Sequence, residues 1–454
     1  MEKDRYAVIW TQINGDPVKM ANIISTGREF RFSYTQDYLN TGSTTGVSIF
    51  SSPDIFEDKP IVHTASEAMP LYPRLMSLIP GQGKKNIQRR IYNNILAKYD
   101  TPPAPGFDTE WALLMMAGRN GIGHIDIFET DFEAQQWYEE KQKPLLQSDE
   151  SELRSTIWQF LKEDLSMALP EDIDLVNLLG PTPSVGGMIP KILATIPDLP
   201  NWNGDFERPG LQHIDGHKSV EVIIKIEYPE YAGLTQLEAL GLEANKKSGV
   251  ITPRYWLANI DDLPMIAIER FDRTQKGTPI PIESFFSAMA SATTDVTGAT
   301  DTDMERVGRM LAAIGKVAKF DVKTSQKSVY QRFLLAILTG NGDMHLENLS
   351  FIGGNDGLSV SPMYDPAPMR AWSRHNLLSA IPFEIEGSLR DSIIRLGKSF
   401  GLNKKIATEL LHQCAESTDN FQEQVLSETN VPHETQKRLV SVISDVRKKL
   451  GVVG

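Results

Sequence analysis

Residues 339–368, TGNGDMHLENLSFIGGNDGLSVSPMYDPAP, contain three oxygen-bearing side chains whose types and spacing could do chemistry. Asp343 lies in a glycine-flanked loop, Asn348 follows five residues later, and Asp365 comes after two short apolar runs. Carboxylate and amide oxygens suit a hard cation such as Mg²⁺. The alternative is that these side chains only cap turns, which Asn and Asp do often.

A predicted hairpin would bring two of these side chains together. Residues 349–352 and 358–363 have strand composition and flank the turn sequence GGNDG. If the turn is centred in that sequence, Asn348 lies opposite about position 362, close to Asp365. The D-x4-N spacing with a later Asp also matches the catalytic loop of protein kinases, where the first Asp accepts a hydroxyl proton and the other two side chains hold metal.

Lys225 is the next candidate, because it stands inside the apolar strand pattern SVEVIIKIEY of residues 219–228. If its face of the strand is covered, the ammonium needs an anionic partner, and phosphate is one such partner. Glu238, on a helix predicted near residues 234–245, could form the ion pair that kinases place there. The alternative is an edge strand whose lysine lies in water.

The segment MIAIERFDR, residues 265–273, is an apolar strand that ends in charged and aromatic side chains. A strand that leads into a connection between two lobes would present backbone groups and an aromatic face to adenine. Glu269, Arg270 and Phe271 are the residues in that position. The alternative is a strand end closed by solvated charges.

Two glycine-rich segments have different interpretations. In SVGGMIPK, residues 184–191, Gly186 and Gly187 allow backbone N–H groups to approach phosphate, and Lys191 adds charge. A glycine pair that only forms a turn is the alternative, and no G-x4-GK[ST] motif occurs, which excludes a Walker-type NTPase. The segment GRNGIGHIDIF, residues 118–128, lacks the dinucleotide fingerprint and predicts a helix end, a turn and a strand.

The expected strands and helices that must position these residues indicate an α+β protein with a two-lobed, protein-kinase-like fold. An additional mixed N-terminal domain is expected over residues 1–145, and a strand-rich lobe with the nucleotide loop over residues 146–272. The helical lobe with the catalytic loop is expected over residues 273–454. Amphipathic helices are predicted at 403–414 and 433–450, where apolar residues recur at helical spacing.

Composition excludes several classes of protein. The chain has 454 residues, enough for two or three hydrophobic cores, and 46 basic against 59 acidic side chains give a net charge of −13. This acidity argues against a general nucleic-acid coat, and no apolar run is long enough to span a bilayer. The amino terminus has no apolar signal core, so a cytoplasmic location without membrane contact is expected. The single Cys414 cannot form an intrachain disulfide or a multi-cysteine zinc site.

The order of these motifs resembles that of the HipA family, the serine/threonine kinases of bacterial toxin–antitoxin pairs. The resemblance rests on SVGGMIPK, IIKIEYPE, IERFDR, GDMHLENLSF and MYDPAP, and more weakly on FRFSYTQDYL, LMSLIPG and GRNGIGHI in the N-terminal part. It therefore covers most of the chain. What it implies about activity and site residues is an expectation.

The resemblance implies a catalytic base at Asp343, Mg²⁺ held by Asn348 and Asp365, and autophosphorylation at Ser184. Glu238 would pair with the phosphate-binding lysine. The implied ATP-binding residues are Gly186, Gly187, Met188, Ile189, Pro190, Lys191, Lys225, Glu269, Arg270, Phe271, His345, Asn348 and Asp365. The implied partners are a protein substrate, with an aminoacyl-tRNA synthetase as the family's example, and a small DNA-binding antitoxin similar to HipB. DNA contact is expected only through that partner.

The chain departs from the family pattern in two places, and these departures define a competing hypothesis. Pro190 removes an N–H donor from the glycine loop, and the catalytic loop has Met344 and Glu347 where the family has a glycine and a lysine. An acidic side chain beside phosphates would repel them unless it turns outward or binds metal. The competing hypothesis is a catalytically silent, HipA-like binding or co-repressor protein.

A third hypothesis is a metal hydrolase built on Asp343, His345 and Asp365. The sequence offers no further ligands near them, and a zinc site at His345 is not predicted without a second His or Cys nearby.

Overall fold

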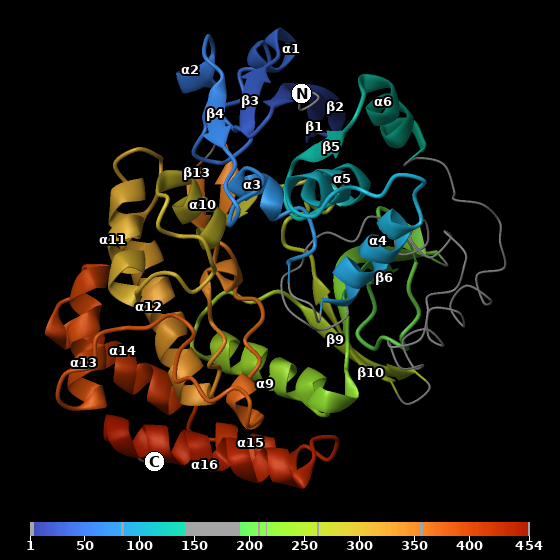
Figure 1. Cartoon of the computed structure of the whole chain (residues 1–454). Helices are drawn as coiled ribbons and strands as arrows, with labels where there is room; N and C mark the ends of the chain where they lie inside the picture. Colours follow the sequence, from blue (N-terminus) through green and yellow to red (C-terminus); the bar gives the residue numbers. More distant parts are fainter. Residues whose placement is uncertain are drawn as a thin grey trace. The chain divides into compact units, whose positions relative to one another are not determined.

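The structure is a computed structural model of the chain, shown in Figure 1, and it describes residues 4–82, 86–140, 191–207, 209–214, 216–260, 263–354 and 357–452. The chain divides into two compact units, which are described separately below. The first comprises Met1–Pro200, Asp205–Ile224 and Asp272–Pro281, and the second Asn201–Gly204, Lys225–Phe271 and Ile282–Gly454.

The first unit contains most of the long antiparallel strands. Its strands are β1 (Arg5–Ile13), β2 (Asp16–Thr26), β3 (Glu29–Tyr34), β4 (Ile61–Thr64), β5 (Asp126–Phe128), β6 (Lys191–Pro197), β7 (His213–Ile214) and most of β8 (His217–Ile226). Its helices are α1 (Gln36–Leu39), α2 (Pro53–Phe56), α3 (Pro73–Met76), α4 (Ile87–Ala97), α5 (Phe107–Ala117) and α6 (Asp131–Glu140).

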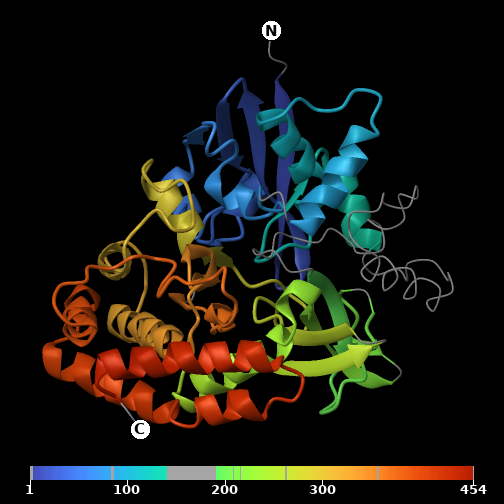
Figure 2. The same ribbon diagram turned by 60° about the horizontal axis from the view of Figure 1, so that its bottom comes forward.

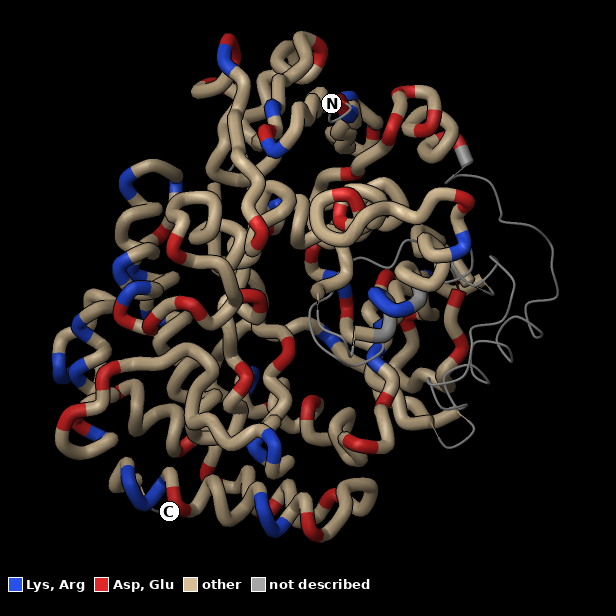
Figure 3. The backbone as a smooth tube through the Cα atoms, in the orientation of Figure 1, with Lys and Arg blue, Asp and Glu red and all other residues tan. Residues whose placement is uncertain are grey.

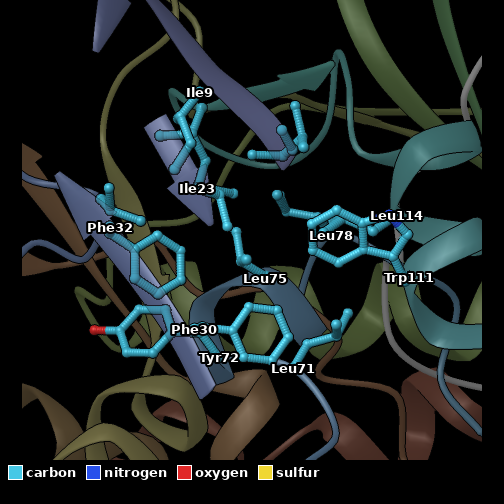
Figure 4. Packing of buried hydrophobic residues seen from close by; sticks show 14 of the residues in the cluster. Ile9, Ile23, Phe30, Phe32, Leu71, Tyr72, Leu75, Leu78, Trp111 and Leu114 are labelled. Atoms are coloured by element: carbon cyan, nitrogen blue, oxygen red, sulfur yellow. The ribbon is translucent and has the colours of Figure 1, made fainter. Parts of the chain in front are cut away.

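Five of these strands form one sheet in the order β4-β3-β2-β1-β5, in which all neighbouring strands are antiparallel. Strict alternation in β3 turns Phe30 and Phe32 to the buried face, where both are at most 1% exposed. Figure 4 shows these rings packed with Leu75 of α3 and Trp111 of α5. Burial of a phenylalanine ring stabilises the fold by about 2–3 kcal/mol, so this face is the core of the N-terminal sheet.

The second unit contains the helices of the C-terminal half. Its strands are β9 (Tyr255–Ile260), β10 (Leu263–Glu269), β11 (Ile282–Ser284), β12 (Ser350–Gly354) and β13 (Gly357–Val360). Its helices are α9 (Leu234–Lys247), α10 (Phe285–Ala292), α11 (Met304–Ile314), α12 (Val322–Thr339), α13 (Leu389–Leu396), α14 (Lys404–Ser417), α15 (Phe421–Ser427) and α16 (His433–Leu450), with short 3₁₀ turns η1 (Pro229–Tyr231), η2 (Leu346–Asn348), η3 (Met369–Ala371) and η4 (Gly397–Phe400).

In this unit α12 is the central helix. Asp321 caps its start by accepting a hydrogen bond from the Thr324 N–H, and its last eleven residues, 329–339, are all buried. Helix α16 contacts both α12 and α15, and Figure 2 shows α15 and α16 side by side. The predicted helices at 403–414 and 433–450 are confirmed as α14 and α16.

The predicted hairpin is also confirmed, as β12 and β13. Phe351 pairs with Val360 and Gly354 with Gly357, and the Ser361 N–H donates to the backbone carbonyl of Ser350 at 2.8 Å. Strand β11 joins the other edge of β12, which sequence reasoning did not predict. The short strands and helices together confirm the predicted α+β class. The domain boundaries at residues 145 and 272 stay predictions.

Acidic and basic residues are both spread along the described chain, as the colours of the backbone in Figure 3 show. Helix α16 has Arg447, Lys448 and Lys449 in its last turn, where the negative end of the helix dipole favours cations. In the described part of the chain, no helix combines the length and the apolar character needed to cross a membrane.

Candidate functional site

Lys225 lies at the centre of an ion-pair triad in the second unit. Its Nζ atom is 2.5 Å from Oε1 of Glu238 and 2.7 Å from Oδ1 of Asp365. Lys225 comes from the end of β8, Glu238 from α9, and Asp365 from the chain that follows the β12–β13 hairpin, 140 residues downstream. Strand, helix and hairpin therefore bring two carboxylates to one ammonium.

The triad is shielded from water to an unequal degree. The side chains of Lys225 and Glu238 are 5% and 1% exposed, whereas that of Asp365 is 25% exposed. Burial acts to lower the pKa of Lys225, but the negative charges of Asp365 and Glu238 outweigh it, and the net shift is upward. The ammonium is therefore charged at neutral pH. The alternative of a solvated edge-strand lysine is wrong for this residue.

The loop that carries Asp343 is organised by Asn341, which sequence reasoning missed. Helix α12 ends at Thr339 and is followed by the capping residue Gly340, whose φ of 82° is a left-handed value that favours glycine. Asn341 is buried; its Oδ1 accepts from the Asp343 N–H at 3.0 Å, and its Nδ2 is 3.5 Å from the backbone carbonyl oxygen of Asp365. The Nδ2 of Asn348 donates to the Asp343 carbonyl at 2.9 Å. The backbone around Asp343, Asn348 and Asp365 thus forms one connected network.

The chain after Asp365 packs closely on this loop at Gly342. A Cβ placed on Gly342 would lie 2.3 Å from the Leu377 carbonyl oxygen and 2.9 Å from Cγ of Arg370. Only a residue without a side chain allows this approach. The glycine beside Asp343 is the sequence signal that could have predicted it.

Asp365 has a strained backbone and a buried neighbour that supports it. Its φ of 55° is in the left-handed region, which is uncommon for a residue with a side chain and is often found at functional sites. The Tyr364 hydroxyl donates to the Glu347 carbonyl at 2.6 Å and is 2.6 Å from Oγ of Ser350. Burial raises the pKa of Tyr364, so the phenol stays protonated. Its ring lies 5.7 Å from that of Phe271, centre to centre.

The three residues predicted to hold adenine, Glu269, Arg270 and Phe271, differ in their surroundings. Glu269 ends β10 and forms two contacts of 2.9 Å with the exposed Arg254 guanidinium. Arg270 is only 3% exposed. Phe271 is partly buried against Tyr364, the residue that precedes Asp365 in the chain after the hairpin.

Two titratable side chains lie within electrostatic reach of Asp343. Burial lowers the pKa of His375, and the negative charge of Asp343 opposes that shift. Burial raises the pKa of Tyr231, and the Asp343 charge adds to it, although nearby Arg374 acts in the other direction. The Tyr231 hydroxyl is 2.9 Å from Nε2 of His375. Sequence reasoning missed both, because they are 112 and 32 residues from Asp343 with no local pattern.

The donor set suits a hard cation better than a soft one. Because Asn348 uses its Nδ2 toward the Asp343 backbone, its oxygen is the atom left to face a cation, and Asp365 supplies carboxylate oxygens. His345 has a buried Nδ1 without a hydrogen-bond partner among the described residues. Over the same residues, no group of three or more His, Cys, Asp and Glu side chains could hold a metal. The amide and carboxylate oxygens of Asn348 and Asp365 are of the chemical type that Mg²⁺ prefers, whereas a zinc site would need further His or Cys ligands.

The proposed nucleotide loop lies mostly outside the described residues. Ser184, Gly186, Gly187, Met188, Ile189 and Pro190 are among those not described. Lys191, the last residue of that motif, begins β6 in the first unit and is 6% exposed.

Two curated proteins with similar sequences are candidate kinases. The chain is 24% identical over 303 residues to a candidate kinase of Haemophilus influenzae, and the aligned residues cover 60% of this chain and 81% of that protein. It is 28% identical over 246 residues to the candidate kinase Y4dM of Sinorhizobium fredii. That match covers 50% of this chain and about half (53%) of Y4dM.

A solved structure matches the fold over almost the whole chain. HipA of Shewanella oneidensis MR-1, solved with HipB and its operator DNA, superposes with a TM-score of 0.61 at 16% identity. The match covers 98% of this chain and 97% of HipA, which confirms the predicted fold. The family model of the HipA-like C-terminal domain matches residues 183–421, more than half of the chain. The chain therefore belongs to the family of proteins with a HipA-like C-terminal domain.

Proposed function

We propose that this chain is a Mg-ATP-dependent protein serine/threonine kinase. The observation that carries the proposal is the buried Lys225, which contacts both Glu238 and Asp365. In kinases a strand lysine pairs with a helix glutamate and contacts the phosphates beside a metal-binding aspartate. The similarity to two candidate kinases supports the same activity.

Each side chain then has a definite task in phosphoryl transfer. Lys225 would hold the phosphates by charge, and its rigid setting would fix their position. Asp343 would accept the proton of the acceptor hydroxyl, and Asn341 would keep the Asp343 backbone in place through its 3.0 Å hydrogen bond. Glu269, Arg270 and Phe271 would border the adenine, and the loop from Gly186 to Lys191 would cover the phosphates.

Asn348 and Asp365 are the residues that would hold Mg²⁺. When bound, the ion would neutralise phosphate charge during transfer. The Lys225 ammonium already balances part of the Asp365 charge, and the Asn348 amide is oriented by its bond to the Asp343 carbonyl. His345 would lie beside the nucleotide.

The silent-protein hypothesis remains the alternative, because Glu347 and Pro190 depart from the family pattern. The backbone oxygen of Glu347 is used by the Tyr364 hydroxyl, which gives this residue a structural role whatever its side chain does. The complete set of Asp343, Asn348 and Asp365 favours an active enzyme, since a silent protein has no need of it.

Substrate and partner are proposed from the family. The substrate would be a protein hydroxyl, with an aminoacyl-tRNA synthetase as the first candidate, and Ser184 would be phosphorylated by the chain itself. The HipA structure that matches this fold contains HipB and operator DNA. A small HipB-like antitoxin is therefore the proposed partner, DNA would be bound through it, and the complex would act in the cytoplasm.

The direct test is incubation of the full-length chain with γ-labelled ATP and Mg²⁺, followed by mass spectrometry of the peptide that contains Ser184. We expect label on the wild type and a loss of about 100-fold or more in Asp343→Asn, because a general base contributes that much. Calorimetry should show nearly unchanged ATP binding in Asp343→Asn. Asp419→Asn, which changes an exposed pair with Lys247, is the matched control and should keep full activity.

Two results would contradict the proposal. A wild type that neither binds ATP nor becomes labelled would favour the silent protein. Equal transfer by Asp343→Asn and wild type would show that Asp343 is not the base. Adding purified aminoacyl-tRNA synthetases to the same reaction tests the substrate: label on one of them, dependent on Asp343, is the expected result.

A further inference from the structure

A loop of the first unit holds the chain directly after the proposed adenine-binding segment. The Arg273 guanidinium donates to the carbonyl of Gly121 at 2.9 Å and to that of Gly123 at 3.0 Å. In return, the Gly123 N–H donates to Oδ2 of Asp272 at 2.9 Å. We call these four residues the glycine clamp; all of them belong to the first unit, although some 150 residues separate the two pairs.

The two side chains of the glycine clamp are buried and form an ion pair. The side chains of Arg273 and Asp272 are 6% and 4% exposed, and they contact each other at 2.8 Å. Glu221 lies 3.9 Å from Nε of Arg273 and adds a second negative charge. Charge-assisted hydrogen bonds in a dry setting are strong and specify one geometry. A guanidinium that spans two carbonyl groups has no equivalent in lysine.

The loop that presents these carbonyls is itself held from several sides. Asn120 and Gly123 have left-handed φ values of 51° and 90°, which turn the backbone sharply. Asp126 accepts from the Asn120 N–H at 2.6 Å, and Arg74 donates to the Ile122 carbonyl at 2.9 Å. The loop is therefore a preformed receptor for Asp272 and Arg273.

The glycine clamp lies next in the chain to the proposed adenine-binding segment, residues 269–271. Asp272 follows Phe271 directly, and the Ile280 N–H donates to the Asp272 carbonyl at 2.8 Å. Phe271 in turn packs against Tyr364. Residues 269–271 are therefore followed directly by the glycine clamp, and their last residue also contacts Tyr364.

We propose that the glycine clamp positions the adenine-binding segment, so that ATP affinity depends on a loop of the N-terminal sheet domain. This inference rests on the proposed function. Asp272 and Arg273 are positioning residues, because they act through Glu269, Arg270 and Phe271 and are not assigned a contact with nucleotide. The motif GRNGIGHI thereby acquires a role in substrate binding.

The test uses the full-length chain and the variant Arg273→Lys, which keeps the charge but cannot span both carbonyls. We expect the Kd and KM for ATP to rise about tenfold, as for the loss of one charge-assisted hydrogen bond, while kcat at saturating ATP stays within about twofold. The control is Arg5→Lys in the same unit, where Arg5 pairs with Asp108 at 2.6 Å; its ATP affinity should not change.

The outcomes separate this inference from the proposed function. If Arg273→Lys lowers the melting temperature but leaves Kd and KM for ATP unchanged, the glycine clamp is structural only and the inference is wrong. If wild type binds no ATP at all, the proposed function fails and the inference fails with it.

A second measurement needs no variant and covers the case in which Arg273→Lys does not fold. Hydrogen exchange of residues 118–125 in the wild type should slow several-fold when a non-hydrolysable ATP analogue saturates the chain. The β2–β3 hairpin, which lacks this connection, should exchange at an unchanged rate. Equal exchange of residues 118–125 with and without nucleotide would overturn the inference.

Discussion

Replacement of Lys225 by methionine should lower the free energy of unfolding by about 3–5 kcal/mol at pH 8, because it leaves a buried carboxylate without its cation. The penalty comes mainly from Glu238, which is 1% exposed, since Asp365 at 25% can recover water. Burial disfavours an unpaired charge, so Glu238 in the variant would take up a proton as the pH falls, and the penalty should shrink toward pH 5. In the wild type, the raised pKa of Lys225 keeps its stabilising charge throughout this range; that contribution is lost only in strong base.

The assay is urea unfolding of the full-length chain, followed by tryptophan fluorescence at pH 5 and pH 8. Lys247→Met is the matched control on α9: its pair with Asp419, at 3.2 Å, is exposed to water, so its loss should change the free energy of unfolding little. The double variant Lys225→Met/Glu238→Gln should recover much of the loss at pH 8, because no buried charge remains unpaired beside the new methionine. The reasoning is refuted if Lys225→Met costs no more than Lys247→Met, or if its penalty is the same at both pH values.

Three other predictions concern the catalytic loop and the N-terminal domain. Asn341→Ala should reduce labelled-phosphate transfer about tenfold and cost about 1–3 kcal/mol in urea unfolding, because it leaves buried backbone groups unpaired; full activity would exclude a positioning role. Gly342→Ala should inactivate the chain in the same transfer assay, since its Cβ would meet the Leu377 oxygen at 2.3 Å, whereas Gly81→Ala, with 3.9 Å of room, should stay active. Burial lowers the pKa of His124 to about 3, so the unfolded chain binds a proton that the folded chain does not, and stability falls as the pH drops below about 6.5. Between pH 7 and pH 4, the free energy of unfolding of His124→Gln should therefore fall by about 3 kcal/mol less than that of the wild type, as measured by thermal unfolding followed by circular dichroism. An identical dependence of stability on pH in the two proteins would contradict this.

Much of the fold could be predicted because its signals are local. Helices α14 and α16 follow apolar residues at helical spacing, and the β12–β13 hairpin follows two strand-like runs around a glycine-rich turn. The third strand beside that hairpin, β11, was missed. It pairs with residues about 70 positions away, and a three-residue strand has no periodicity of its own.

In the candidate site, too, some residues could be predicted from the sequence and others could not. The D-x4-N spacing and the strand lysine could be seen in the sequence, since both are short patterns. Asn341 and Tyr364 could not, because an asparagine before a glycine and a tyrosine before an aspartate are ordinary dipeptides. Their importance comes from burial and from the hydrogen bonds that they make after folding.

By itself, the sequence determined the types of side chain available and their order: a strand lysine, a helix glutamate, and an acid–amide–acid set at Asp343, Asn348 and Asp365. Only the tertiary structure decided that Lys225 is buried between Glu238 and Asp365 and that Arg273 spans the Gly121 and Gly123 carbonyls. The physical reason is that burial and distant partners depend on packing. Glu238 is only 13 positions from Lys225, and the sequence could predict that pair, whereas Asp365 is 140 positions from Lys225 and Gly121 is 152 from Arg273. Contacts over such distances depend on how strands and helices pack, and no local pattern of polarity encodes that packing.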